Sequence, residues 1–216
     1  MNAPRYRTSA SWFKAGLDYQ KAGVNLVKAF SCYKISAEKG FVFGMYHLAR
    51  CYQVGIGTEK NLAAAFKWMR QAADKKYAEA EFQTALLGLQ NSAAQKTEAL
   101  VYLGRAAKQN HPTAQRLLAD CYLNGVIGAV NIECAFEWYA LSAKAGDRIA
   151  QYNLACMYQR AHGVAQNFQP ACFWFERAAK QGYQPAFNAL LQLEKNKLNP
   201  QARQSLARLK FMKKVL

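Results

Sequence analysis

The chain has 216 residues, 52% of them apolar and 19% charged, and its 29 Lys and Arg against 13 Asp and Glu give a formal net charge of +16. With 12 Tyr, 12 Phe and 4 Trp it is too apolar for an intrinsically disordered chain. No window approaches the ~18 consecutive apolar residues of a membrane span.

The N-terminal residues hold Arg5 and Arg7 with no apolar run behind them, unlike a secretory signal. We therefore expect a cytoplasmic protein, or a periplasmic one only if a signal peptide has been removed.

Ala, Leu, Gln, Lys and Glu dominate the long stretches and only 5 Pro occur, which favours helix over strand. Apolar residues at helical spacing predict six pairs of helices in chain order. The first helix of each pair is expected at 9–21, 41–54, 77–90, 112–124, 148–160 and 184–196. The second is expected at 24–39, 61–75, 95–109, 131–145, 167–181 and 199–214.

A repeated phrase identifies these pairs as copies of one unit. Trp68, Trp138 and Trp174 lie 70 and 36 residues apart, and so do Tyr52, Tyr122 and Tyr158. A pair that cannot bury its own apolar face becomes stable by stacking on its neighbours. The sequence thus predicts an all-α fold, a right-handed superhelix of about six helix-turn-helix repeats in one domain, residues 1–216. The repeats span 9–40, 41–76, 77–110, 111–146, 147–182 and a degenerate C-terminal cap, 183–214.

Cap residues mark both ends of each second helix. Its N-cap is expected at Asn25, Asn61, Asn131 and Asn167, with Gln95 in the third repeat, because the Asn side-chain oxygen accepts an unpaired backbone N–H. The helix is expected to end at a left-handed residue, which is Gly40, Lys76, Asn110, Gly146 or Gly182. Since Lys suits that conformation poorly, we expect a weaker or different cap at Lys76.

The units resemble the Sel-one-like repeat family, relatives of the tetratricopeptide repeat. The resemblance is carried by "GMYHLARCY", "AQRLLADCY" and "AQYNLACMY", followed by a Gly turn and by "NLAAAFKWMRQAADKK", "NIECAFEWYALSAKAG" and "NFQPACFWFERAAKQG". It implies a non-catalytic adaptor that binds other proteins. The cysteine-rich branch of that family pairs regularly spaced Cys, a spacing absent here, so we expect free thiols.

Signals for an enzyme are poor. His47, His111 and His162 have no second ligand at i+3 or i+4, and Gly55–Gly57 follows a helix rather than the strand that a dinucleotide loop requires. A Cys–His nucleophile pair is conceivable for His47 and Cys51 on one helix, but no acid–base group converges on it. We expect no catalytic residue, no cofactor and no metal site.

In the tetratricopeptide relatives, the first helices line a concave groove. The resemblance therefore implies partner-binding residues at first-helix positions off the core stripe: Tyr46, His47, Arg50, Gln83, Arg116, Asp120, Tyr152 and Asn153. The partner is expected to be a protein or peptide, and an acidic one would match the charge. Two alternatives stay open: Tyr46 and Tyr152 could pack between repeats, and Arg116 and Asp120 could form an i,i+4 pair.

The C-terminal helix is rich in cations and lacks acids from residue 195 onward. Its basic patch comprises Lys195, Lys197, Arg203, Arg208, Lys210, Lys213 and Lys214. Such a patch could bind nucleic acid or another anionic surface, which is the alternative function. It could equally serve only to keep the surface soluble.

Overall fold

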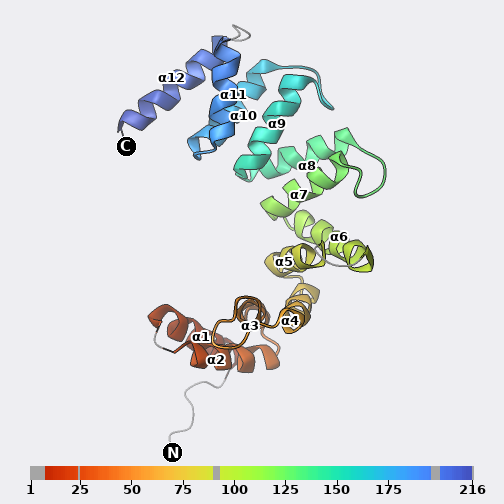
Figure 1. Cartoon of the computed structure of the whole chain (residues 1–216), viewed down its shortest axis with the longest axis vertical. Helices are drawn as coiled ribbons and strands as arrows, with labels where there is room; N and C mark the ends of the chain where they lie inside the picture. Colours follow the sequence, from red (N-terminus) through yellow and green to blue (C-terminus); the bar gives the residue numbers. More distant parts are fainter. Residues whose placement is uncertain (1–7, 24, 90–92, 196–199, 216) are drawn as a thin grey trace, which may run out of the picture. The chain divides into compact units, whose positions relative to one another are not determined.

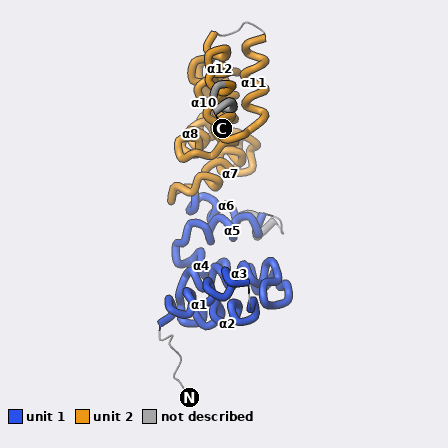
Figure 2. The backbone as a smooth tube through the Cα atoms, turned by 90° about the vertical axis from the view of Figure 1, so that its left-hand side faces the viewer, with its two compact units in different colours: residues 1–106 blue, residues 107–216 orange. Residues whose placement is uncertain are grey.

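The computed structural model describes residues 8–23, 25–89, 93–195 and 200–215, with the side chains of 93–96 and 211–215 left aside. The chain divides into two compact units, residues 1–106 and 107–216 (Figure 2). All regular structure in the described ranges is helical (Figure 1).

The first unit contains α1 (Ser9–Ala22), α2 (Leu26–Glu38), α3 (Val42–Val54), α4 (Leu62–Asp74), α5 (Ala78–Leu89) and most of α6 (Ala93–Lys108). The second contains α7 (Pro112–Leu123), α8 (Ile132–Lys144), α9 (Arg148–Arg160), α10 (Phe168–Lys180), α11 (Gln184–Lys195) and α12 (Pro200–Val215). The expected all-α class of helix-turn-helix repeats is confirmed, and each helix ends within two residues of its expected bounds. That residues 1–216 act as one domain stays a prediction.

The expected Asn caps are present at four second helices. The Oδ1 atoms of Asn25, Asn61, Asn131 and Asn167 accept backbone N–H groups at 2.8–3.0 Å. The backbone N–H groups of the last three donate to the carbonyls of Tyr52, Tyr122 and Tyr158, which closes the turn between the two helices. The expected cap at Gln95 is wrong, because α6 begins at Ala93 and places Gln95 in its first turn.

The left-handed residue after the second helix recurs with one geometry. Gly40, Lys76, Asn110, Gly146 and Gly182 have φ of 83°, 61°, 62°, 101° and 77°. The Lys76 N–H donates to the Ala73 carbonyl at 2.8 Å, as the Gly182 N–H does to Ala179 at 2.9 Å. The expectation of a different cap at Lys76 is therefore wrong. The surrounding helices impose this turn, and Lys76 adopts it at a conformational cost of about 1 kcal/mol.

Replacing Lys76 by Gly should stabilise the first unit by about 0.5–1 kcal/mol, because Gly adopts positive φ without a steric penalty. Thermal unfolding followed by circular dichroism should show a midpoint higher by about 2 °C. Lys75→Gly is the matched control. Lys75 has φ of −83°, so its replacement should lower the midpoint. An unchanged or lower midpoint for Lys76→Gly would contradict the conformational cost that we assign to Lys76.

Contacts between neighbouring repeats bury the core. We call the contact between the second helix of one repeat and the first helix of the next a seam; α2 packs on α3, α4 on α5, α8 on α9 and α10 on α11 in this way. One buried cluster joins Ala135, Tyr139 and Ala143 of α8 to Ala150 and Leu154 of α9.

Different seams contain equivalent side-chain contacts, just as the repeats have equivalent spacing in the sequence. The rings of Phe30 and Tyr52 meet edge to face with centroids 5.3 Å apart, and Phe136 and Tyr158 repeat this at 5.4 Å. Buried Gln151 on α9 donates its side-chain amide to the Ala143 carbonyl at 3.1 Å, which adds a donor from the next repeat to a C-terminal carbonyl of α8 that also accepts the Gly146 N–H. Periodic spacing in the sequence therefore reflects equivalent contacts in both units.

Candidate partner-binding face on the first helices

A group of rings lies along the first helices of the first unit and reaches inward to Tyr33, which is buried on α2. We call it the aromatic cluster; its members are Phe13, Tyr33, Phe41, Phe43, Tyr46, His47 and Tyr77. The His47 ring lies 5.1 Å from both Phe13 and Tyr33, and Phe43 lies 5.1 Å from Tyr77. Most of these rings are half-buried, but 40% of Phe43 is exposed. The face thus offers aromatic surface to solvent.

Four of the expected groove residues lie on the first helices of this unit. Tyr46 packs edge-on against Tyr77 of the next repeat at 5.4 Å, which is the inter-repeat packing that the sequence left open. Its hydroxyl donates to Glu79 Oε1 at 3.5 Å, and Gln83 donates to the same oxygen at 2.9 Å. Arg50 is exposed beside Tyr46. The structure therefore brings Tyr46, His47 and Arg50 together and holds Gln83 on Glu79.

Burial governs the titration of His47 and Cys51. Burial and then the charge of Arg50 lower the pKa of His47 below its ordinary value of 6.5. Burial raises the pKa of Cys51 to about 11, so this thiol carries almost no thiolate at neutral pH. The raised pKa of Cys51 disfavours the thiolate that a nucleophile pair of these two residues would need, and we interpret both as packing groups.

Stability of the first unit should fall as the pH drops from 7.5 to 5.5. The unfolded His47 binds a proton near pH 6.5 and the folded one only at lower pH, so its contribution is full above 6.5 and is lost below it. The measurement is the thermal midpoint at each pH. His47→Leu, which introduces the residue found at equivalent position 117, should flatten this dependence.

A slope unchanged by His47→Leu would mean that the His47 imidazole is as easily protonated in the fold as outside it.

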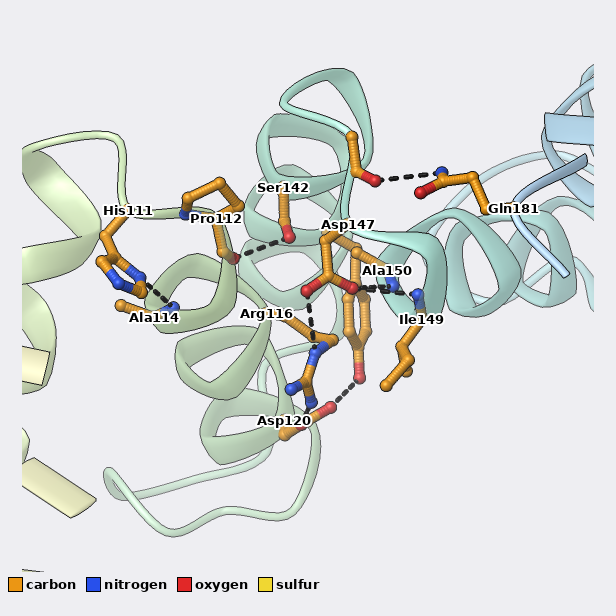
Figure 3. Close-up of polar contacts among 12 residues, drawn as sticks. His111, Pro112, Ala114, Arg116, Asp120, Ser142, Asp147, Ile149, Ala150 and Gln181 are labelled. Carbon is orange, nitrogen blue, oxygen red and sulfur yellow. Dashed lines mark hydrogen bonds and ion pairs between the residues drawn. The ribbon is translucent and has the colours of Figure 1, made fainter. Parts of the chain in front are cut away.

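In the second unit, the equivalent positions form an ion network (Figure 3). Arg116 Nε lies 3.3 Å from Asp147 Oδ2, and its Nη1 lies 3.3 Å from Asp120 Oδ2. The Tyr139 hydroxyl donates to the other oxygen of Asp120. Asp147 also caps α9 through the N–H groups of Ile149 and Ala150. Arg116 and Asp120 form the i,i+4 pair that the sequence left open, and Asp147 extends it to the next repeat.

The last two expected groove residues, Tyr152 and Asn153, line a cavity of about 310 Å³. The Tyr152 ring contacts Phe175 at 5.6 Å and Tyr183 at 5.4 Å, so it also packs between repeats. The sequence did not single out Arg160, an exposed cation in the cavity wall. Arg160 is the last residue of α9. The other repeats have no charged residue at the equivalent position, so the repeat pattern did not point to it.

The basic patch is only partly within the described residues. Lys195, Arg203, Arg208 and Lys210 are exposed, whereas Lys197 and the side chains of Lys213 and Lys214 lie outside the description. Arg208 is not a free cation, because its Nη1 lies 3.4 Å from Glu176 Oε2 on α10.

Two features are absent from the described ranges. Within those ranges, no group of three or more His, Cys, Asp and Glu side chains could hold a metal ion. None of the helices there combines the length and the apolar character that crossing a bilayer demands.

A model of the Sel1 repeat, the Sel-one-like repeat named above, matches residues 6–41, 42–77, 78–111, 112–147 and 148–183. The chain belongs to the Sel1 repeat family. The sixth helix pair lies outside these matches, as expected of a degenerate cap. Sel1 repeat proteins generally mediate protein–protein interactions and typically act as non-catalytic scaffolds.

Known proteins resemble the chain over most of its length. Chitin synthase regulatory factor 3 of Schizosaccharomyces pombe is 32% identical over 74% of this chain, which spans only 18% of that protein. A crystal structure of a Sel1 repeat protein from Oxalobacter formigenes is 26% identical, has a TM-score of 0.82 and covers 95% of this chain and 86% of its own. A protective antigen of uropathogenic Escherichia coli shares the fold at 22% identity and a TM-score of 0.60, with 95% and 57% covered.

Proposed function

We propose that this Sel1 repeat protein is a non-catalytic scaffold that binds an acidic segment of a partner protein on the first-helix face. The observation that carries the proposal is the aromatic cluster with exposed Phe43 and exposed Arg50 at its edge. Exposed aromatic and Arg side chains are the residue types that dominate binding energy at protein interfaces.

The expected chemistry of the partner comes from the charges of this face. Exposed cations on the first helices include Arg50 beside the aromatic cluster, and Arg160 in the wall of the cavity of about 310 Å³. Arg116, by contrast, is already paired with Asp120 and Asp147 and has a side chain only 16% exposed. Arg50 in the first unit and Arg160 in the second are therefore proposed to meet partner carboxylates, each on the first helices of its own unit. Arg116 is proposed to hold the first-helix face of the second unit in shape.

The test compares partner capture from the native source by the parent protein and by the variants Arg50→Glu and Arg160→Glu, with quantitative mass spectrometry as the readout. Each variant should reduce recovery of the main partner at least tenfold, because a repulsive charge replaces an attractive one at an interface. Phe43→Ala should reduce it as well, through lost aromatic contact.

The control is Lys34→Glu, an equal change of charge at an exposed position on second helix α2. It should keep the partner set of the parent protein. Equal loss in Lys34→Glu and Arg50→Glu would show that overall charge, rather than the first-helix face, determines capture.

A second candidate function is binding of nucleic acid or another anionic surface by the basic patch. Exposed Lys195, Arg203 and Lys210 favour it. The Arg208–Glu176 pair weakens it, because one of its cations is already balanced by a carboxylate.

A further inference from the structure

A larger cavity lies mainly on α10 and α12 of the second unit and is lined by none of the expected groove residues. Its volume is about 650 Å³, and it is open to solvent. Its walls come from α10 and α12 and from the start of α9, and its side chains include Phe173, Glu176, Arg177, Lys180 and Arg208. The sequence motifs did not indicate this cavity, because Arg208 is the only residue of the basic patch in its wall.

The cavity wall holds three cations, Arg177, Lys180 and Arg208. The buried carboxylate of Glu176 holds the last two in position. The Glu176 side chain is only 7% exposed, and its oxygens lie 2.8 Å from Lys180 Nζ and 3.4 Å from Arg208 Nη1. Burial alone would raise the pKa of Glu176, but hydrogen bonds from Lys180 and Ser205 and the charges of Lys180 and Arg208 lower it. Glu176 is thus ionised at neutral pH and fixes both cations at the rim, where their side chains remain 38% and 60% exposed.

Aromatic rings position the third cation. The Arg177 guanidinium lies 5.5 Å from the ring centre of Phe173 and 5.7 Å from that of Trp174, and these two rings meet edge to face at 5.0 Å. Within the described residues, no carboxylate lies at ion-pair distance from Arg177. Phe173 itself is 51% exposed. Because the Arg177 guanidinium lies against aromatic rings rather than a carboxylate, its N–H groups can donate hydrogen bonds to a ligand.

The repeat does not require these residues. One repeat earlier, the positions of Phe173, Glu176 and Arg177 hold Glu137, Ala140 and Leu141. The Sel1 core therefore forms with different chemistry at the same sites. The cavity thus has residue types that the preceding repeat does without, which indicates a role besides the repeat packing.

We infer that this cavity binds an acidic peptide segment that carries an aromatic side chain. Three cations face one carboxylate, so the cavity keeps two unbalanced positive charges, which two ligand carboxylates would neutralise. The exposed Phe173 ring would pack against the aromatic side chain of the ligand. This second binding surface is independent of the first-helix face.

The probe is a fluorescein-labelled octapeptide with glutamates on both sides of a central phenylalanine, titrated with the full chain at about 0.1 M salt and followed by fluorescence anisotropy. Arg177→Glu should weaken binding at least tenfold, and Phe173→Ala about threefold to tenfold. Both side chains are exposed and outside the core, so circular dichroism should show the helix content of the parent protein. A peptide with glutamine in place of glutamate should not bind, and one with alanine in place of phenylalanine should bind less tightly.

Three controls separate the outcomes. Lys34→Glu should bind the peptide as the parent does, and so should the double variant Arg50→Glu, Arg160→Glu, which keeps this test apart from the first-helix proposal. A double-stranded DNA oligonucleotide of equal charge should compete poorly. Undiminished peptide binding by Arg177→Glu, an equal loss in Lys34→Glu, or preference for the DNA would each overturn the inference.

Discussion

The seam between one repeat and the next is the contact on which the rest of this structure depends. A single pair of helices leaves one apolar face uncovered, and the next first helix covers it. Ala143 and Ala150 are both buried at the seam between α8 and α9, where small side chains allow the helices to approach closely. A second buried cluster includes Phe175 of α10 together with Leu190 and Leu206 of α11 and α12.

Because successive repeats must pack against one another, first-helix residues at one position differ in chemistry but make the same contact with the next repeat. Tyr46, Arg116 and Tyr152 occupy equivalent positions, and each contacts the residue that precedes the next first helix, which is Tyr77, Asp147 or Tyr183. The contact between successive repeats at this position is a ring contact in two cases and an ion pair in the third. The same face can therefore carry aromatic surface in the first unit and a charged network in the second.

Sequence reasoning located the helices because capping and periodicity are local properties. Asn61 caps α4 regardless of its distant neighbours, so the pattern alone places it. It could not foresee that Lys76 would adopt the turn of a Gly, since the flanking helices decide that geometry. Nor could it show that Arg116 is paired with Asp147, or that Phe173, Arg177 and Arg208 line one cavity, because these groups meet only in the folded chain. Spacing predicts the scaffold, whereas each site also needs side chains from another part of the chain, such as Asp147 beside Arg116 and Arg208 beside Glu176.

Hydrogen exchange with mass spectrometry on an Ala150→Leu variant tests the seam most directly. Ala150 is fully buried, so a larger side chain should strain the contact by about 1–3 kcal/mol. If neighbouring repeats stabilise one another, amide exchange should accelerate on both sides, in α8 as well as in α9, while Ala207→Leu at an exposed position of α12 leaves it unchanged. Acceleration confined to α9, with α8 protected as in the parent protein, would show that each pair of helices is stable by itself and would contradict this account.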